Sequence, residues 1–432
     1  MTQIQQSAHE AKQASIQLAA LDSVVKNQAL QAIADKLAAR ASAIVEANKK
    51  DMDRSTQQNL AAPLLKRLKF DESKIQETIA GIKSLIALPE PVGQTLAATE
   101  LDAGLELYKV SCPIGVIGVI FESRPDALVQ ISTLCLKSGN AALLKGGSEA
   151  LETNRILADI IQSASEEAGI PKGWVQLLET RDDVNQMLKL DSYIDLIIPR
   201  GSNEFVQYIM NNSNIPVLGH ADGICHVYVD KDADIPMAVR VAVDSKCQYV
   251  AVCNAAETLL VHAEIADEFL PKLDIALAHH KVTLYGCERT QDIIGCKPAS
   301  EEDWKTEYLD YVLSIKIVDS IEEALEHINT YGSGHTETIL TTNAKTAEFF
   351  MNIADSGNVF WNCSTRFSDG FRYGLGAEVG ISTNKIHARG PVGLEGLLIY
   401  KWKLKGAGHV VTDYATGKRA FTHKPLRKGF SM

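Results

Sequence analysis

Short apolar runs alternate with longer amphipathic segments from Val116 onward, and this alternation constrains the fold more than any other feature. VIGVIF (116–121) precedes an amphipathic segment at 127–140, and AALLKGG (141–147) precedes another at 150–169. Apolar runs of this length are typical of buried strands, whereas the longer segments have helical spacing. The alternation predicts parallel strands joined by crossover helices.

The alternation falls into two blocks, which predicts two α/β lobes. The first block continues through VQLLE and YIDLIIPRGS, and a second begins near Ile224 with CHVYVD, a helix-like segment at 233–246 and the run TLLVH. Residues 5–90 have helical spacing throughout, and Pro271 predicts a kink or a late start in the helix over 265–280. After Gly390, LLIYKW predicts a strand that reaches outside the compact body, toward another subunit.

Composition excludes several classes of protein. The chain has 432 residues, of which 46% are hydrophobic and 22% charged, and a formal charge of −11, which opposes binding to nucleic acid or to anionic lipid. No apolar run approaches the roughly 20 residues that cross a bilayer, and the first residues lack a secretory signal, so we expect a cytoplasmic protein. The eight cysteines form no CxxC pair or dense framework, which predicts reduced thiols.

Cys253 is the candidate nucleophile. It follows the small-residue run AV and precedes Asn254, just before the predicted strand TLLVH, and reactive groups usually lie at the end of an element. A buried, inert thiol is the alternative, because free cysteine is among the most buried residue types. A nucleophilic thiolate needs a positive charge, a helix N-terminus or hydrogen-bond donors beside it.

Two strand-to-helix turns are candidate nucleotide sites. The fingerprint GxGxxG is absent, and GVIG at 115–118 is only a fragment of it. KGGSEA (145–150) and PRGSNEF (199–205) each end a strand with glycine and open a helix, which predicts bare backbone N–H groups for phosphate, with Lys145 facing a ribose or phosphate. Taken singly, each is more often an ordinary strand-to-helix turn, but two on consecutive strands favour a ligand site.

The segment 361–393 is rich in Gly, Ser, Thr and Arg and is a candidate anion-binding loop. Arginine matches the geometry of carboxylate and phosphate groups, although a charged loop can also be solvated surface. The histidines offer no metal site: HExxH is absent, and His279 and His280 are expected at an exposed helix end. We predict no metal. The candidate anion ligands are Ser364, Thr365, Arg366 and Arg372.

Several long motifs resemble the gamma-glutamyl phosphate reductase family of the aldehyde dehydrogenase superfamily. They are FESRPD, KSGNAALLKGGSEA, PRGSNEF, GHADGICHVYVD, CNAAETLLVH and STRFSDGFRYGLGAEVGISTNKIHARGPVGLEGL, and they occur in order over nearly the whole chain. One departure is the run KCQYVAVCN, which adds Cys247 and lacks the proline that the family usually has before the cysteine.

The resemblance implies an α/β, aldehyde dehydrogenase-like fold, with a Rossmann-type cofactor domain, an α/β catalytic domain and a small oligomerisation strand region. The NADP-binding domain, with a helical N-terminal segment, is expected over 1–98 and 114–222. The catalytic domain that carries the nucleophilic cysteine is expected over 223–392, and an oligomerisation hairpin and C-terminal tail over 99–113 and 393–432.

The resemblance also implies a reaction, the NADPH-dependent reduction of L-glutamate 5-phosphate to L-glutamate 5-semialdehyde and phosphate in proline biosynthesis. Cys253 is then the nucleophile that forms a thioester, and the Cys253 backbone N–H and a side chain near Ser123 are the expected oxyanion donors. In VLGHADG, His220 stands about where hydrolytic relatives have a glutamate that activates water, so a strong base is missing there, although His220 can still act as a base.

The cofactor and substrate contacts follow from the same resemblance. Ser148 stands where NAD-preferring relatives often have a glutamate, which favours NADP because no carboxylate repels the 2′-phosphate. The expected cofactor contacts are Lys145, Gly147, Ser148, Gly201, Ser202 and Glu307, and the expected substrate contacts are Arg124, Asn254, Ser364, Thr365, Arg366 and Arg372.

The resemblance further implies a homo-oligomer, a dimer or tetramer, and a possible glutamate 5-kinase partner. Two alternatives stay open. One is an NAD(P)-linked dehydrogenase that makes a free acid without phosphate, and the other is a catalytically silent scaffold relative, against which the intact Cys253 and both glycine turns argue.

Overall fold

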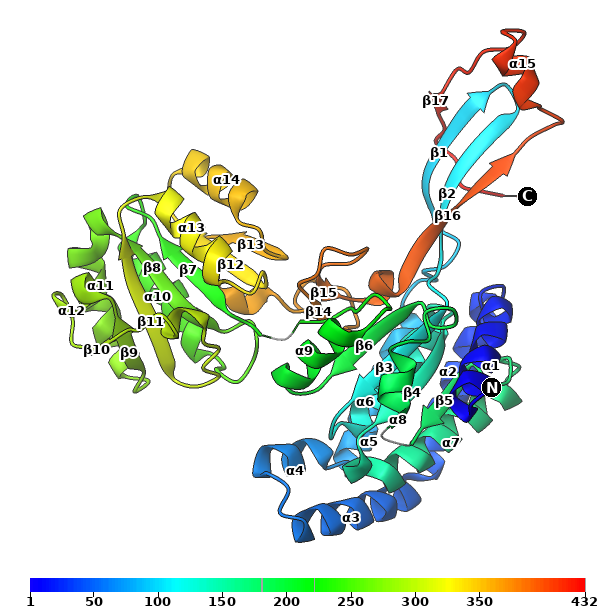
Figure 1. Ribbon diagram of the computed structural model, residues 1–432, viewed down its shortest axis with the longest axis horizontal. Helices are drawn as coiled ribbons and strands as arrows, with labels where there is room; N and C mark the ends of the chain where they lie inside the picture. The colour runs from blue at the N-terminus through cyan, green and yellow to red at the C-terminus, as the bar shows by residue number, and fades with distance from the viewer. Residues whose placement is uncertain (180–181, 221, 432) are drawn as a thin grey trace. The chain divides into compact units, whose positions relative to one another are not determined.

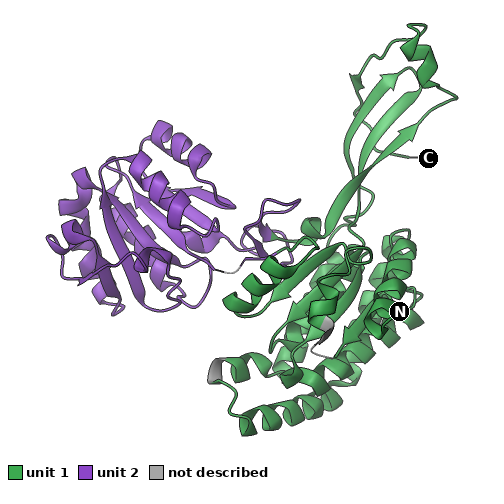
Figure 2. Ribbon diagram, viewed as in Figure 1, with its two compact units in different colours: residues 1–218, 392–432 green, residues 219–391 purple. Residues whose placement is uncertain are grey.

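The computed structural model describes residues 1–179, 182–220 and 222–431, and it divides into two compact units. Unit 1 comprises Met1–Leu218 and Val392–Met432, and unit 2 comprises Gly219–Pro391 (Figure 2). Within these described ranges, no helix combines the length and the apolar character needed to cross a membrane.

Helices form the opening of unit 1, as the spacing over 5–90 predicts. Thr2 begins the first helix with a capping box, in which its side chain accepts from the Gln5 N–H, and the Asp22 side chain caps the second. Asp51 on the third helix is fully buried and accepts hydrogen bonds from the backbone and hydroxyl of Thr153 at 2.7 Å each, which ties this helix to the start of α7. The helices are α1 (Gln3–Leu18), α2 (Ser23–Ala39), α3 (Ala41–Gln57), α4 (Ala62–Leu68) and α5 (Glu72–Ala87).

A four-stranded parallel sheet in the order β5-β4-β3-β6 forms the centre of unit 1 in the described part of the chain. Every residue of β3 and β4 is buried, which agrees with the continuous apolar runs that predicted them. The strands are β3 (Val116–Phe121), β4 (Ala141–Gly146), β5 (Val175–Leu178) and β6 (Leu196–Arg200); between them lie α6 (Pro125–Lys137), the 3-10 turn η1 (Ser148–Ala150), α7 (Leu151–Glu167) and α8 (Asp182–Met187), and α9 (Asn203–Asn212) follows β6.

The register of this sheet brings both glycine turns to one edge. Phe121 at the end of β3 pairs with Gly146 of β4 on one side and with Arg200 of β6 on the other. The chain therefore leaves all three strands at the same carboxyl edge, on both sides of β3, where the strand order reverses. Ligands of open parallel sheets bind at such a point.

An antiparallel sheet in the order β16-β2-β1-β17 completes unit 1 within the described residues. Its outer strand β16 contains all but the first residue of the predicted LLIYKW strand and pairs with β2 from Leu398 opposite Pro113 to Lys405 opposite Glu106. This edge strand exposes Ile399, Tyr400, Trp402 and Leu404. The elements are β1 (Thr95–Asp102), β2 (Leu105–Pro113), η4 (Leu394–Leu397), β16 (Leu398–Lys405), α15 (Val411–Ala415) and β17 (Lys424–Pro425).

Unit 2 contains, among its described residues, a seven-stranded parallel sheet in the order β10-β9-β11-β8-β7-β12-β13 and a short β14-β15 pair. The α/β alternation predicted for this half of the chain is confirmed, and Pro271 lies inside α11 rather than at its start. The strands are β7 (Cys225–Val229), β8 (Ala256–His262), β9 (Thr283–Gly286), β10 (Lys297–Pro298), β11 (Val312–Val318), β12 (Thr336–Leu340), β13 (Asn358–Trp361), β14 (Gly380–Ser382) and β15 (Gly390–Val392). The helices are α10 (Ile235–Cys247), α11 (Ala263–Ala278), α12 (Glu288–Gln291), η2 (Asp303–Lys305), α13 (Ile321–Tyr331), α14 (Ala344–Ile353) and η3 (Thr365–Phe367).

Helices cover both faces of this sheet. Successive side chains of a strand point to opposite faces, so each strand can pack against helices on both sides. In unit 2, α13 and α14 lie on the other side of the sheet from α10 and α11 (Figure 1). In β7, Val227 and Val229 pack with the side chains of α10 and α11, whereas Tyr228 between them packs with those of α13 and α14. The continuous apolar runs in the sequence are thus explained by burial on two sides.

A buried ion pair joins α10 to β8. The Lys246 ammonium lies 2.5 Å from a carboxylate oxygen of Glu257, and both side chains have no exposed surface. Burial raises the pKa of Glu257 to about 7, against the opposing effect of Lys246. The second Glu257 oxygen accepts the Leu309 N–H at 3.3 Å, so the pair also holds the loop that follows Glu307.

His327 on α13 gives the fold a testable acid sensitivity. Burial is the largest of the effects that lower the pKa of His327 to about 2, and the charges of His226 and Lys316 act in the same direction. The folded state keeps His327 neutral while the unfolded chain takes up a proton below pH 6.5, so this contribution to stability is present above pH 6.5 and is lost as the pH falls toward 2. Between pH 6 and pH 5, we expect the free energy of unfolding of the wild type to fall by about 1 kcal/mol more than that of His327→Gln. Urea unfolding at each pH measures the difference, and equal losses in both proteins would contradict the assignment.

Candidate active site

Cys253 lies in the turn between α10 and β8, as predicted from its place before TLLVH. The turn is closed by a hydrogen bond from the Ala255 N–H to the Val252 carbonyl at 3.1 Å, and β8 begins at Ala256. Cys253 is half-buried, whereas the next residue, Asn254, is 4% exposed. The thiol is therefore presented by a turn whose following residue is anchored in the protein interior.

Gly223 packs directly on the backbone of Cys253. A Cβ placed on Gly223 would lie 2.1 Å from the Cys253 carbonyl oxygen and 2.4 Å from its Cα, far inside contact distance. Only glycine permits this approach, since the obstacle is backbone rather than a movable side chain. The segment 222–224 thus packs against the backbone of the cysteine turn at Gly223 and limits its movement.

A chain of buried polar contacts holds this turn in place. Cys225 at the start of β7 donates its S–H to the Cys253 carbonyl at 3.1 Å, and its sulfur lies 3.6 Å from Nδ1 of His335. The chain continues from His335 through Thr336 to Ser368, with contacts of 2.8 Å each between His335 Nδ1 and Thr336 Oγ1 and between Thr336 Oγ1 and Ser368 Oγ. Such a network fixes one arrangement because each buried polar group needs its partner.

Asn254 closes the same network from the other side. Its Nδ2 donates to the Ser368 carbonyl at 2.8 Å, and its Oδ1 is buried with no protein partner among the described residues. The sequence predicts Asn254 as a substrate contact, and the structure gives its amide nitrogen a contact that joins the cysteine turn to the loop after β13. A substrate role for the remaining oxygen stays a prediction.

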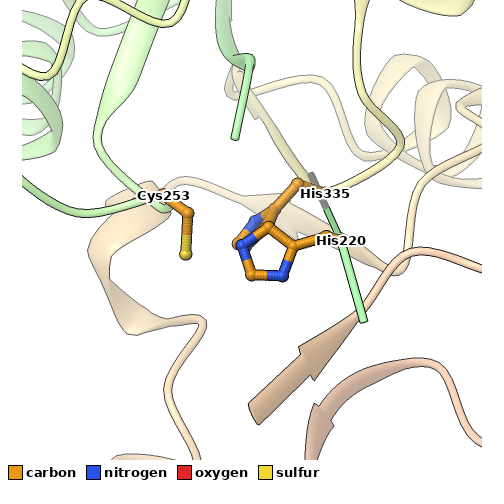
Figure 3. A group of neighbouring side chains, drawn as sticks. All are labelled: His220, Cys253 and His335. Atoms are coloured by element: carbon orange, nitrogen blue, oxygen red, sulfur yellow. The ribbon is translucent and has the colours of Figure 1, made fainter. Parts of the chain in front are cut away.

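Two histidines lie beside the Cys253 sulfur. Ligand atoms of Cys253, His220 and His335 all lie within 4.8 Å of one another, and the two rings meet edge to face with centroids 5.0 Å apart (Figure 3). His220 Nδ1 lies 3.0 Å from the Ile381 carbonyl oxygen, which can only accept, so Nδ1 carries the proton and Nε2 has the lone pair. His220 is half-buried, so its ring can accept a proton from a neighbouring thiol.

His335 is fully buried and stays neutral. Burial lowers the pKa of His335 well below its ordinary value, and His220 adds to the effect. Because Thr336 donates its hydroxyl proton to Ser368, its oxygen accepts from His335 Nδ1–H, which leaves the lone pair on Nε2. This nitrogen has no protein partner among the described residues.

The predicted anion-binding loop lies in the same unit as Cys253. Arg366 is 7% exposed, donates its Nε–H to Gln248 at 3.0 Å, and is within electrostatic range of Cys253. Burial, and after it the neighbouring Arg372, lowers the pKa of Arg366. The structure therefore brings two guanidinium groups near each other and one of them near the thiol, where a positive charge stabilises a thiolate.

The remaining residues of this loop are occupied to different degrees. Ser364 Oγ accepts the Arg366 N–H at 3.2 Å and lies 3.3 Å from Ser245 Oγ, so it caps η3. The Thr365 hydroxyl is buried with no protein partner in the described ranges, and Arg372 pairs with Asp369 at 3.3 Å. A substrate role for Ser364, Thr365 and Arg372 stays a prediction.

The first glycine turn of unit 1 follows β4. Lys145 is 7% exposed and donates from Nζ to the Gly146 carbonyl at 2.6 Å, and Ser148 is exposed at the start of η1. The Arg54 guanidinium of α3 donates to the carbonyls of Ser148 at 3.0 Å and Glu149 at 3.2 Å, and Asp51 holds it from behind. A fixed cation thus stands beside Ser148.

One backbone N–H group in each of the two turns already has a protein acceptor, which corrects the prediction that these groups are bare. The Gly147 N–H donates to the Phe121 carbonyl at 3.0 Å, and the Ser202 N–H donates to the Glu122 carboxylate at 3.0 Å. A Cβ on Gly201 would lie 2.6 Å from the same carboxylate, so glycine lets Glu122 reach the start of α9. An acidic side chain at a helix N-terminus is favoured by the helix dipole, and it uses the position that the sequence assigns to phosphate.

Ser123 and Arg124 follow β3 at the same edge. Ser123 is 2% exposed and left-handed (φ 45°), and its N–H and O–H donate to the Glu149 carboxylate at 2.5 and 2.9 Å. The Ser123 side chain, one of the two donors expected for an oxyanion, thus has an acceptor inside unit 1. Burial lowers the pKa of Arg124, and Arg200 at the end of β6 adds to this, which places two guanidinium groups at the carboxyl edge of this sheet.

Glu307 lies in unit 2, in the loop before β11, and is half-buried. Its charge raises the pKa values of Cys225 and Glu257, although burial is the larger cause for both. Glu307 therefore lies in the same part of unit 2 as the cysteine turn. Its expected contact with a ribose stays a prediction.

Sequence reasoning missed four residues of these sites. Gly223 and Cys225 stand inside the quoted motif GHADGICHVYVD, where a glycine two residues before a strand signals close backbone approach. His335 comes just before the buried strand β12 and carries no spacing motif, and Arg54 is 94 residues from Ser148. Only the three-dimensional fold connects the last two to the sites.

Known proteins resemble this chain in sequence and in fold. The sequence model of the aldehyde dehydrogenase family matches residues 1–291. A gamma-glutamyl phosphate reductase of Acetivibrio thermocellus is 66% identical over 99% of this chain and 100% of its own, and one of Pelotomaculum thermopropionicum is 65% identical over 98% of each. The crystal structure of gamma-glutamyl phosphate reductase from Thermotoga maritima is 41% identical with a TM-score of 0.92, covering 94% of this chain and 99% of that one.

The chain therefore belongs to the aldehyde dehydrogenase family of oxidoreductases, whose members bind nicotinamide cofactors. Within that family its place is among the gamma-glutamyl phosphate reductases, with which it shares half or more of its residues over nearly its whole length. Both the fold class and the resemblance predicted from the sequence are confirmed.

Replacing Gly223 tests its packing contact with the Cys253 backbone. In Gly223→Ala the new methyl group must displace the Cys253 backbone, so we expect the rate of iodoacetamide modification of Cys253 to change at least tenfold while the protein stays folded. Peptide mass spectrometry measures the rate. Gly295→Ala is the matched control, because its Cβ meets nothing within 4 Å in the same unit. An unchanged rate in Gly223→Ala would contradict the role of this contact.

Proposed function

We propose that the chain reduces L-glutamate 5-phosphate with NADPH to L-glutamate 5-semialdehyde and phosphate, the second step of proline biosynthesis. The observation that carries this proposal is the half-buried Cys253 thiol on an anchored turn. The imidazoles of His220 and His335 lie beside this thiol, and the Arg366 guanidinium is within electrostatic range of it. The same turn occurs in a chain that is 66% identical to a protein named gamma-glutamyl phosphate reductase.

In the first half of the reaction, the base and the nucleophile are both side chains of unit 2. His220 Nε2 accepts the thiol proton, and the Cys253 sulfur attacks the acyl carbon of the substrate. A carbon–sulfur bond forms as the bond from that carbon to the phosphate oxygen breaks, so phosphate leaves and a thioester remains on Cys253. Covalent capture divides one difficult step into two easier ones.

The second half reduces the thioester. When bound, the reduced nicotinamide supplies hydride to the thioester carbon, which gives a thiohemiacetal on Cys253. The carbon–sulfur bond then breaks, the aldehyde leaves and the sulfur regains a proton. Negative charge develops on the acyl oxygen in both halves, and the Cys253 backbone N–H is the donor we assign to it, with Ser123 as the second donor once Glu149 releases it.

The arginines of the loop after β13 suit the charges of the substrate. An acyl phosphate with a distant carboxylate carries negative groups at both ends, and the loop offers two guanidinium groups, Arg366 near the thiol and Arg372 near Arg366. Arg366 is held by Gln248, which keeps the guanidinium oriented before the substrate arrives. Ser364 and Thr365 supply hydroxyl groups in the same loop.

The site also limits hydrolysis of the thioester. A glutamate that would activate water is replaced by His220, whose ring is oriented by the Ile381 carbonyl. His335 beside it is neutral, and its Nδ1–H is committed to Thr336, so it adds no strong base. Phosphate release rather than attack by water is the outcome that this arrangement favours.

The first glycine turn fits a nucleotide with a 2′-phosphate. Ser148 is exposed and uncharged, the Arg54 guanidinium is fixed at its carbonyl, and Lys145 lies one strand residue before the turn. These groups would hold the ribose and its phosphate, Gly147, Gly201 and Ser202 would form the turns beside the pyrophosphate, and Glu307 would reach the nicotinamide ribose. The cations at this edge support NADP over NAD.

The remaining features of the proposal concern location and partners. None of the eight cysteines forms a disulfide in the described ranges, and a thiol nucleophile needs a reducing compartment, so we place the enzyme in the cytoplasm. The exposed apolar edge strand β16 supports a homo-oligomer, because such an edge is a template for another chain. A glutamate 5-kinase that supplies the labile acyl phosphate is the proposed functional partner.

The phosphate requirement separates this function from its alternatives. Run backwards with glutamate semialdehyde, NADP and phosphate, the wild type should form NADPH only when phosphate is present. Cys253→Ala should lose this activity by about 10⁴-fold or more with its fold retained, because no other group can form the thioester. Cys287→Ala, another half-buried thiol of unit 2, should keep full activity. NADPH formed without phosphate would instead favour the dehydrogenase that makes a free acid.

Ser148→Glu tests the choice of cofactor. A carboxylate here would repel the 2′-phosphate and compensate the charge of Arg54, so the KM for NADP should rise about tenfold or more while that for NAD stays within about twofold. Steady-state kinetics with both cofactors measures the ratio. Gln162→Glu, at an exposed position of α7, is the control for added charge. Equal KM changes for both cofactors would contradict the assignment.

A further inference from the structure

We propose that Cys253, His220 and His335 form a binding site for a soft divalent cation, Zn²⁺, whose binding reversibly blocks the nucleophile. The site is inhibitory and is separate from the cofactor requirements of the reaction, for which the sequence predicts no metal. It rests on the proposed function only in taking Cys253 as the nucleophile, and cation binding can be measured without any turnover.

The three donors match the chemistry of zinc. One thiolate and two neutral imidazoles are among the ligands that Zn²⁺ prefers, and their donor atoms all lie within 4.8 Å of one another. Tetrahedral zinc with bonds of about 2.0–2.3 Å needs donors separated by about 3.5 Å, so closing the site requires a movement of about 1 Å. Cys253 and His220 are half-buried and can supply that movement, whereas His335 is fixed.

The orientation of both imidazoles is the second observation that points to a cation. His220 Nδ1–H is committed to the Ile381 carbonyl and His335 Nδ1–H to Thr336 Oγ1, which leaves the Nε2 lone pair as the ligand on each ring. Histidines that bind metals almost always donate their other ring N–H to such a partner. His335 Nε2 is, in addition, fully buried and has no protein partner in the described part of the chain.

The surroundings of the site favour reversible binding of Zn²⁺ over permanent binding. The protein supplies three ligands and leaves a fourth position for water, and two of the three ligands are partly exposed. Arg366 is within electrostatic range of Cys253 and opposes a further positive charge, while the thiolate offsets it. Coordination takes the sulfur lone pair that would attack the acyl carbon, so the occupied site cannot form the thioester.

The test measures Zn²⁺ binding to the metal-free full chain by competition with a chromophoric zinc chelator. We expect one Zn²⁺ per chain in this site, with affinity lowered at least tenfold in each of Cys253→Ala, His220→Gln and His335→Asn. Asn is chosen for His335 because its amide can replace the Nδ1–H bond to Thr336 while removing Nε2. Cys287→Ala and His280→Gln, a half-buried thiol and an exposed histidine of the same unit, should bind as the wild type does.

A second readout follows the thiol itself. Zn²⁺ should slow iodoacetamide modification of Cys253 at least tenfold, leave that of Cys287 unchanged, and inhibit the reductase reversibly on chelation. The proposal would be overturned if all three ligand variants bound Zn²⁺ with the affinity of the wild type. It would also be overturned if bound Zn²⁺ left the modification rate of Cys253 unchanged. If His335→Asn does not fold, His220→Gln carries the test, because His220 is partly exposed. An inactive wild type that still shows the predicted binding pattern would contradict the proposed function and leave this site established.

Discussion

The close contact between Gly223 and the backbone of Cys253 is the constraint on which the rest of the catalytic unit depends. A nucleophile on a turn has to be both exposed and fixed, and these demands conflict unless the backbone is held by something other than the reactive side chain. Here the backbone is held by the packing of Gly223, by the Cys225 S–H on the Cys253 carbonyl and by the Asn254 amide on Ser368, and none of these three contacts uses the Cys253 side chain. The buried network through His335 and Thr336 then gives the neighbouring ring one tautomer.

The two units use opposite edges of their parallel sheets. In unit 1, the ends of β3, β4 and β6 are level, and the candidate nucleotide residues follow them at the carboxyl edge, the usual ligand edge of such sheets. In unit 2, Cys225, Ala256 and Thr336 are the first residues of β7, β8 and β12, so the cysteine turn and its partners lie at the amino edge. The buried Lys246–Glu257 pair stabilises this part of unit 2, because it joins α10 to β8 and holds the loop after Glu307.

The sequence predicted the elements well because burial on two faces produces continuous apolar runs, as in VIGVIF and CHVYVD, and both runs form strands of parallel sheets. It also predicted that the cysteine stands at an element end. Strand order is not written in such runs, and it is the order β8-β7-β12 that brings His335 to Cys253. Likewise, no local pattern could show that Glu122 and Glu149 reach the N–H groups of Ser202 and Ser123, since these contacts depend on how β3, β4 and β6 are aligned.

A covalent adduct is the central claim, and trapping it is the most direct measurement. The protein is incubated with glutamate semialdehyde and NADP without phosphate, quenched in acid, digested and examined by peptide mass spectrometry. The account predicts a glutamyl group on the peptide that contains Cys253, labile to hydroxylamine and absent when phosphate is added before the quench. An enzyme that turns over with phosphate yet never carries this group, or carries it on another residue, would contradict the account.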